Sequence, residues 1–326
     1  MSRGSRISGI GVYRPKKIVD NSQISERLNV SQEWIRKRSG ITSRRYAGPD
    51  EPLSVMAGEA ANNALEEAGI SAEEVGCIIV ATTTHLSQMP SLASAVAYDI
   101  GANQAGSFDI LAACAGFPYG VAMASDMVKA GSSRHVLVIG AERITDILDP
   151  DDQSTAFLFA DGAGAAVVSE SESFEIGPVA WGTDGSRASA VGMTGHWVPK
   201  LRTDQDLPWP RLGMKGWRVY RWAVNDLAPG ALRAISYAGV DPRDIDVFIP
   251  HQANKLITQE LTNQIGFRQN IIVANDIEQS GNTSSASIPL ALDELRRSGL
   301  AESGMKALAI GFGSGLVYAA QVVQIP

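Results

Sequence analysis

The sequence has 326 residues, of which 44% are hydrophobic and 19% are charged, and its formal net charge at pH 7 is -7. This composition is typical of a globular protein with one large domain or two smaller ones, and the negative charge argues against wholesale binding of nucleic acid. Two cysteines exclude a disulfide framework, and four scattered histidines lack the spacing of a metal site. No stretch reaches the roughly 18 apolar residues of a membrane span. We therefore expect a cytoplasmic protein that binds no metal ion, nucleic acid or membrane.

Short apolar runs alternate with helical segments in the first half of the chain. The run 77–82 is followed by a helical stretch and by a turn at Cys114. A helix over 121–129 then ends before Gly131, and the run 136–140 follows. Runs of β-branched and aliphatic residues bounded by glycine are typical of parallel strands that are buried on both faces.

The second half of the chain repeats this order. The corresponding segments are the run 247–251, a turn at Asn282, a helix over 288–297 and the run 307–311. The intervals match as well, because Thr82 lies 32 positions before Cys114. In the second half, His251 lies 31 positions before Asn282. The sequence therefore predicts an α/β protein that was built by duplication of one unit.

The apolar pattern breaks at 169–173, a stretch of serine and glutamate. We place the boundary between the two halves near this stretch. We expect an N-terminal half over 1–172 and a C-terminal half over 173–326. The runs 162–168 and 315–323 would supply a later strand in each half. The segment 185–215 fits neither half, and we expect an irregular insertion or flap there, since long irregular loops tend to be functional.

Cys114 is the most informative residue of the first half. It follows an apolar run, and its neighbours Ala113 and Ala115 are both small. A lone thiol at a turn from strand to helix is accessible to a reactant, and the positive end of the helix dipole favours its thiolate. We interpret Cys114 as a nucleophile. The alternative is a buried cysteine that packs as a small hydrophobe.

Two further polar residues stand at turns of the second half. If both halves share one topology, corresponding turns meet across a pseudo-twofold axis, and Cys114, His251 and Asn282 converge. The alternative for His251 is a structural role at a strand end, and for Asn282 a role as a turn or N-cap residue. Their matching positions in a duplicated chain favour one shared site.

Cysteine, neutral histidine and asparagine together suit acyl-transfer chemistry. A thiolate attacks an acyl thioester and forms an acyl-enzyme. The N–H donors of His251 and Asn282 can bond one thioester carbonyl, and so stabilise the enolate that forms when carbon dioxide leaves a malonyl group. The glycine-rich turn 311–315 can bring a backbone N–H beside that of Cys114 and complete an oxyanion hole.

Several segments of the sequence resemble one enzyme family. They are 113–117, 161–165, 251–254 and 280–287, and the similarity extends from 9–15 to the terminal strand. The family is β-ketoacyl-[acyl-carrier-protein] synthase III, a thiolase-fold condensing enzyme that starts fatty acid synthesis. The resemblance implies an α/β, thiolase-like fold with two pseudo-repeated halves in a layered αβαβα arrangement. It also implies a homodimer that needs no cofactor, because the CoA thioester is a substrate.

The resemblance also implies a role for each site residue. A short acyl-CoA acylates Cys114, CoA leaves, and malonyl-acyl carrier protein decarboxylates and condenses with the help of His251 and Asn282. The N–H groups of Cys114 and Ser314 form the oxyanion hole. The residues implied to contact CoA are Trp34, Arg38, Gly216, Ala253, Asn254 and Phe312. Those implied to dock the acyl carrier protein are Gln252, Lys255 and Leu256.

Three positions depart from the family pattern. Gln153 stands where relatives carry an arginine that stacks on the base of CoA, so we expect a looser grip there. Ser314 replaces a glycine, which should be tolerated because the backbone supplies the donor. Leu256 stands where relatives carry a basic residue, which moves the basic carrier contact to Lys255.

Met89 is expected to cap the primer pocket of the other subunit in a homodimer. Relatives with phenylalanine at this position favour the smallest primers. Because methionine is thinner and more flexible, we expect acceptance of branched or slightly longer primers such as isobutyryl-CoA. The alternative is that Met89 serves only in interface packing.

Three other functions stay open at this point. A papain-like hydrolase uses cysteine, histidine and asparagine in this order, but the duplication and the absence of a tryptophan soon after Cys114 count against it. A non-catalytic scaffold with a degenerate thiolase fold would leave Cys114 unmodified by acyl-CoA. A priming ketosynthase or acyltransferase of a polyketide pathway shares all three polar residues, so only its genomic neighbourhood or its carrier protein would separate it.

Overall fold

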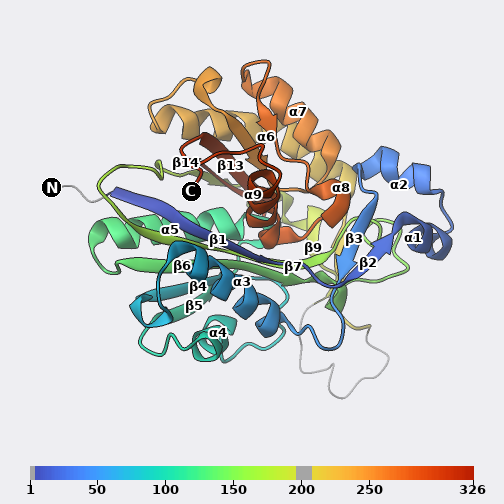
Figure 1. The fold of residues 1–326 in the computed structure, drawn as a ribbon. Helices are drawn as coiled ribbons and strands as arrows, with labels where there is room; N and C mark the ends of the chain where they lie inside the picture. Colours follow the sequence, from blue (N-terminus) through green and yellow to red (C-terminus); the bar gives the residue numbers. More distant parts are fainter. Residues whose placement is uncertain (1–3, 196–207) are drawn as a thin grey trace.

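The computed structural model describes residues 4–195 and 208–326, which form two mixed sheets of five strands each (Figure 1). The first sheet has the strand order β1 (Gly4–Tyr13), β7 (Asp161–Ser171), β6 (His135–Arg143), β4 (Cys77–Ala81) and β5 (Gly106–Ile110). The second has the order β8 (Ala180–Thr183), β14 (Val317–Gln324), β13 (Lys306–Gly313), β11 (Val247–Pro250) and β12 (Ile272–Val273). The two orders correspond strand by strand.

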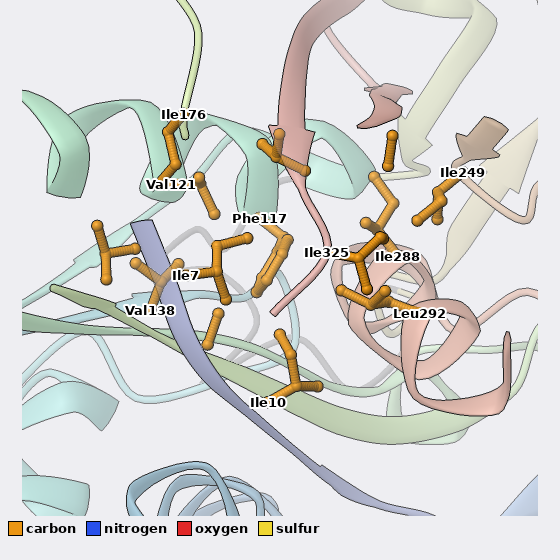
Figure 2. Packing of buried hydrophobic residues seen from close by; sticks show 14 of the residues in the cluster. Ile7, Ile10, Phe117, Val121, Val138, Ile176, Ile249, Ile288, Leu292 and Ile325 are labelled. Carbon is orange, nitrogen blue, oxygen red and sulfur yellow. The ribbon is translucent and has the colours of Figure 1, made fainter. Parts of the chain in front are cut away.

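Helices cover both faces of each sheet. The outer helices are α3 (Leu53–Ala68) and α4 (Leu92–Ile100) on the first sheet, and α6 (Gly216–Tyr237) and α7 (Lys255–Ile265) on the second. Between the sheets lie α5 (Gly116–Ala130) and α9 (Ser287–Arg297). Figure 2 shows this central layer, where side chains of both halves pack together, among them Ile7, Ile10, Phe117, Val121, Val138, Ile249, Ile288 and Leu292. The layers therefore alternate as αβαβα.

Each sheet has a parallel centre and an antiparallel flank. In the first sheet β4 is parallel to β5 and β6, and in the second β11 is parallel to β12 and β13. The continuous apolar runs arise because helices bury both faces of these strands. The predicted duplication is confirmed. β7 ends at Ser171 in the first sheet and β8 begins at Ala180 in the second, while the division into domains at 172 and 173 stays a prediction.

Two short 3-10 turns precede the helices of the central layer. They are η2 (Ala113–Ala115), which leads into α5, and η7 (Ser284–Ala286), which leads into α9. Their first residues both have a positive φ, 47° at Ala113 and 51° at Ser284. Cys114 and Ser285 therefore hold equivalent positions in the two halves. Pairing Cys114 with Asn282, as the sequence intervals do, is wrong by three positions, because the loops before the two turns differ in length.

Smaller elements flank the two sheets. Near the N-terminus these are β2 (Lys17–Asp20), α1 (Asn21–Leu28), α2 (Gln32–Ser39) and β3 (Ser43–Tyr46), and α8 (Ile277–Ser280) precedes η7. β9 (Val191–Met193) and β10 (Leu212–Met214) form an antiparallel pair. The prediction that 185–215 is wholly irregular is therefore wrong at these strands, which are too short to give a periodic apolar pattern. The part of the expected flap over 196–207 lies outside the described residues.

The helices of the molecule show no membrane-spanning character in the part of the chain that the structure describes. None of them is both long and apolar enough to cross a membrane. The longest, α6, carries several charged residues and a proline along its length.

Candidate active site

A pocket of about 840 Å³ is lined by residues of both halves, and the three predicted catalytic residues lie in its wall. Cys114 comes from η2 of the first half, His251 directly follows β11, and Asn282 lies two positions before η7. The duplication thus brings together residues that are distant in sequence. Over 4–195 and 208–326, no cluster of His, Cys, Asp and Glu side chains could hold a metal ion.

Cys114 is the middle residue of η2, two positions before α5, and is half-buried. Burial raises the pKa of its thiol to about 12; a hydrogen bond with Ser284 opposes this rise, and the charge of Glu142 adds to it. Burial therefore opposes the thiolate that the helix dipole favours. The roles of the thiolate and of Cys114 as a nucleophile stay predictions.

His251 is buried at the end of β11, with 2% of its surface exposed. Its Nδ1 lies 2.7 Å from Ser287 Oγ, and Phe312 packs edge-on against the imidazole with 5.1 Å between the ring centroids. Burial lowers the pKa of the imidazole to about 3, so the ring is neutral near pH 7. Because Ser287 Oγ already accepts the N–H of Gln252, we assign the hydroxyl proton to the bond with Nδ1. His251 Nε2 then carries a proton and is a donor.

Hydrogen bonds of its backbone and of its side-chain oxygen hold Asn282 in place. Its N–H donates to Leu158 O, and its C=O accepts the N–H of Ala160, both at 2.9 Å. Its Oδ1 accepts the N–H of Ser284 at 2.9 Å, which is the turn role considered as the alternative. The carboxamide NH₂ has no protein partner within the described ranges. Asn282 can therefore serve the turn with its oxygen and donate to a ligand with its nitrogen.

β13 places a residue without a side chain, Gly313, directly against Cys114. A Cβ added to Gly313 would lie 2.8 Å from the backbone nitrogen of Cys114, so the close approach requires glycine. Ser314 follows in the wall of the pocket, and its hydroxyl donates to Val191 O at 2.7 Å. Because this side chain is engaged with β9, Ser314 is left to contribute its backbone to the pocket, as a glycine would.

Two polar residues beside Cys114 are not predicted by the sequence analysis. Ser284 Oγ donates to Glu142 Oε1 at 3.0 Å, and Ser284 also opposes the rise in the pKa of the Cys114 thiol. Glu142 is fully buried at the end of β6, and this burial raises the pKa of its carboxyl. The signal in the sequence is a carboxylate at the end of an otherwise apolar strand. A search for apolar runs alone passes over it.

Comparison with known proteins supports one family. Family models for 3-oxoacyl-[acyl-carrier-protein] synthase III and for its C-terminal part match residues 108–185 and 235–325. A β-ketoacyl-[acyl-carrier-protein] synthase III 1 of Streptomyces coelicolor is 46% identical over 331 residues, which cover 99% of this chain and 96% of the relative. The chain belongs to the β-ketoacyl-[acyl-carrier-protein] synthase III family. A family member from Streptomyces glaucescens is also 46% identical, with 99% and 96% of the two chains covered.

Solved structures of synthase III enzymes share the fold. A priming β-ketosynthase of a polyketide biosynthetic pathway superposes with a TM-score of 0.97 at 45% identity, covering 100% of this chain and 97% of its own. A synthase III from Aquifex aeolicus has a TM-score of 0.90 at 35% identity, with 99% and 100% covered. The predicted thiolase-like fold is confirmed, and the chain is a condensing enzyme of the acyltransferase type.

The residues that the synthase III family would use for CoA are mostly in the pocket wall. Those that line it are Arg38, Gly216, Ala253, Asn254 and Phe312. Trp34 does not line it: the Arg38 guanidinium covers its ring at 4.6 Å from the centroid, and Phe157 packs edge-on at 5.1 Å. An adenine would therefore meet Arg38 or Phe157 before Trp34, unless Arg38 moves aside. The role of Trp34 as a stacking residue stays a prediction.

The three residues predicted to dock the carrier protein have different surroundings. Leu256 lines the pocket and is 43% exposed, and Lys255 pairs with Glu278 at 3.3 Å. Gln252, in contrast, is 1% exposed, and its side chain accepts the N–H of Ile277 and donates to a backbone carbonyl. The prediction that Gln252 docks a carrier protein is wrong, because its side chain points into the protein and is already satisfied there.

Two further expectations of the synthase III pattern concern Gln153 and Met89. Gln153 lines the pocket, but its amide donates to Leu28 O at 2.8 Å, so it is held by the protein and cannot replace a stacking guanidinium. Met89 lies in the loop between β4 and α4, outside the pocket of its own chain, and is 80% exposed. Its role as a primer cap stays a prediction.

Proposed function

We propose that the protein condenses a short-chain acyl-CoA with malonyl-acyl carrier protein, with loss of carbon dioxide, and so starts fatty acid synthesis. The observation that carries this proposal is the single pocket that contains Cys114, His251 and Asn282. A nucleophile beside two neutral N–H donors suits acyl transfer followed by enolate formation. The duplicated fold and the family membership argue against a papain-like hydrolase.

The first half-reaction is acylation of Cys114. The sulfur attacks the carbonyl carbon of the acyl-CoA, and the CoA thiolate leaves. The backbone N–H groups of Cys114 and Ser314 hold the oxyanion of the tetrahedral intermediate. Removal of one such donor typically costs roughly 100-fold to 1000-fold in rate. The approach of β13 at Gly313 supports this arrangement, since it sets the two backbone segments side by side.

The second half-reaction is decarboxylation and condensation. The Nε2–H of His251 and the NH₂ of Asn282 bond the thioester carbonyl of the malonyl group and stabilise the enolate that remains when carbon dioxide leaves. The enolate carbon attacks the acyl carbon, and Cys114 is released. Because the pKa of His251 is lowered to about 3, its donor is the neutral ring at any working pH.

The substrates of this reaction carry phosphate, and the pocket carries positive charge. Lys37, Arg38 and Lys215 are among its lining residues and suit the phosphates of CoA and of the carrier's phosphopantetheine arm. Lys255 and Leu256, at the start of α7, are proposed to contact the acidic carrier protein. CoA enters this reaction as part of a substrate, and no cofactor is proposed.

A homodimer in the cytoplasm completes the proposal. β5 is an edge strand of the first sheet, and an unpaired edge is a template for pairing with a second copy. Large apolar side chains nearby in sequence are exposed, including Tyr98, Leu111 and Met89 at 78%, 80% and 80%. In such a dimer Met89 would cap the partner's pocket. The free cysteines Cys77 and Cys114 suit a reducing compartment.

Acylation of the purified protein tests the proposal. The protein is incubated with acetyl-CoA or isobutyryl-CoA, the mass of the Cys114 peptide is measured, and malonyl-acyl carrier protein is then added. We expect an acyl adduct on Cys114, faster labelling by isobutyryl-CoA, and a β-ketoacyl product. A strong preference for acetyl-CoA would contradict the primer assignment to Met89, and a protein that forms no adduct would be a scaffold.

A second candidate is the priming ketosynthase of a polyketide pathway. The structural neighbour with a TM-score of 0.97 is a priming β-ketosynthase, and it favours this alternative. The chemistry at Cys114, His251 and Asn282 would be the same. Condensation assays with fatty-acid and polyketide carrier proteins, compared by kcat/KM, separate the two: a preference of about tenfold or more for the polyketide carrier protein would establish the alternative.

A further inference from the structure

A fully buried carboxylate lies behind η7, the turn that follows Asn282, and neither half-reaction above uses it. Glu142, near the end of β6, has 0% of its surface exposed. Its oxygens accept hydrogen bonds at 2.8–3.2 Å from the N–H of Thr83 and from the hydroxyls of Thr83, Thr84, Ser284 and Ser285. The threonines belong to the first half and the serines to η7 of the second. Burial of a carboxylate is costly, so one that ties the two halves together calls for a reason.

Glu142 stands where the other half of the repeat has Gly313. Each lies two positions after a strand glycine that admits the opposing turn, and the first residue of each turn has a positive φ, at Ala113 and at Ser284. Ala113 packs directly on its strand, since a Cβ added to Gly313 would lie 3.2 Å from Ala113 Cβ. Ser284 instead donates its hydroxyl to Glu142 Oε1 at 3.0 Å. A side-chain hydrogen bond thus replaces direct packing on the backbone.

This hydrogen bond holds Ser284 in a conformation that few residues other than glycine adopt. A positive φ, here 51°, crowds Cβ against the backbone, so it persists only where the surroundings enforce it. η7 leads into α9, and α9 is packed into the central layer between the sheets. A change of φ at Ser284 would therefore rotate the peptide group before it rather than move the helix. That peptide group carries the Ser284 N–H.

The Ser284 N–H determines which end of the Asn282 carboxamide is free. It donates to Asn282 Oδ1 at 2.9 Å and so leaves the NH₂ group for the pocket that Asn282 lines. The two ends of a carboxamide have nearly the same shape, so only hydrogen bonds select between them. If the carboxamide turned over, its oxygen would face the malonyl carbonyl and repel the forming enolate. The decarboxylation step therefore depends on where the Ser284 N–H points.

We propose that Glu142 is a positioning residue for decarboxylation, an inference that rests on the proposed function. Through its bond with the Ser284 hydroxyl, Glu142 holds η7 in its left-handed conformation. The turn in turn holds Asn282 with its NH₂ group toward the thioester carbonyl of the malonyl group. Glu142 does not line the pocket, so it acts on the reaction only through Ser284.

Release of carbon dioxide from malonyl-acyl carrier protein tests this role in a Cys114→Ser parent, in which Ser284 can no longer influence the pKa of a thiol. Ser284→Ala removes the hydroxyl and keeps Cβ. We expect kcat to fall by about 10-fold to 100-fold, with KM within about twofold, because a misplaced donor stabilises the transition state less. Ser284→Gly also removes the hydroxyl but adopts a positive φ freely, so its kcat should return to within about threefold of the parent.

Two further variants assign the effect to Glu142. Ser285→Ala is the matched control, because Ser285 is also buried and donates to the same Oε1 at 3.1 Å, whereas the Asn282 oxygen bonds Ser284. Its kcat should stay within about threefold of the parent. Glu142→Met keeps the length of the side chain and removes the acceptor. It should slow the parent by about 10-fold or more, but the Ser284→Gly protein by no more than about threefold, since the two changes break the same link.

Several outcomes would overturn this role of Glu142. Decarboxylation by Ser284→Ala at the parental rate is one. A Ser284→Gly protein as slow as Ser284→Ala is another, because the hydroxyl would then matter for a reason other than the conformation of the turn. Equal losses from Glu142→Met in the parent and in Ser284→Gly would give Glu142 a general structural role. If Glu142→Met does not fold, the two Ser284 variants decide. A wild type that releases no carbon dioxide from malonyl-acyl carrier protein would instead refute the proposed function.

Discussion

The turns η2 and η7, which precede α5 and α9, hold equivalent positions in the two halves, but they contact different groups. The Cys114 turn meets bare backbone at Gly313, whereas the Ser285 turn meets the carboxylate of Glu142. Gly313 and Glu142 both lie two positions beyond a strand glycine that admits the opposing turn. The repeated backbone therefore sets which positions face one another, and the side chains at those positions differ between the two halves. Under the proposed function, the two halves would serve different steps of one reaction.

Replacement of the nucleophile should have the largest effect on this division. Cys114→Ser is expected to lower condensation by at least about 1000-fold, because a hydroxyl is a poorer nucleophile and a poorer leaving group. Release of carbon dioxide from malonyl-acyl carrier protein should continue, since it depends on the other half. Radiolabelled carbon dioxide and β-ketoacyl product are measured in parallel. Condensation at the normal rate would place the nucleophile elsewhere.

Removal of the donors of the second half should give the reverse pattern. His251→Ala and Asn282→Ala are each expected to lower decarboxylation by roughly 100-fold to 1000-fold, because each removes a hydrogen bond to the forming enolate. Acylation of Cys114, measured by mass, should stay within about tenfold of wild type in both variants. If both variants condensed at normal rates, the assignment of these donors would be wrong.

A single methyl group should disturb the Cys114 turn alone. Gly313→Ala places a Cβ 2.8 Å from the backbone nitrogen of Cys114, so the oxyanion donor must shift. We expect acylation to fall by roughly 10-fold to 100-fold, since misplacement weakens such a donor. Gly185→Ala is the control, because a Cβ there meets nothing within 4 Å. Equal acylation rates in the two variants would contradict this account of the turn.

The smallest effect is expected at the outer wall of the pocket. Gln153→Arg supplies a guanidinium that can stack on the base of CoA, and such contacts are worth about 0.5–1 kcal/mol at exposed sites. The KM for acyl-CoA should fall by about twofold to fivefold, with kcat unchanged. Initial-rate kinetics at fixed malonyl-acyl carrier protein measure this. An unaltered KM would show that the base does not reach this position.

The fold and the meeting of Cys114, His251 and Asn282, the three predicted catalytic residues, follow from the sequence for local reasons. Apolar runs mark the buried strands, and Gly131, with a φ of 78°, ends α5 where expected. Glu142 escapes the same analysis because its partners come from Thr83 and Ser284, which only tertiary packing brings near. A motif likewise gives the position of Gln252 but not its burial. Side-chain orientation depends on the whole fold, not on the neighbouring residues.

Two glycines make each half complete the site of the other. Gly140 of the first sheet receives the turn of the second half, and a Cβ added to Gly311 of the second sheet would lie 3.0 Å from the carbonyl oxygen of Cys114. One half alone would leave both turns without the strand that each packs against, so the site depends on the interface between the halves. A substitution that separates the two sheets should therefore disorder both turns together.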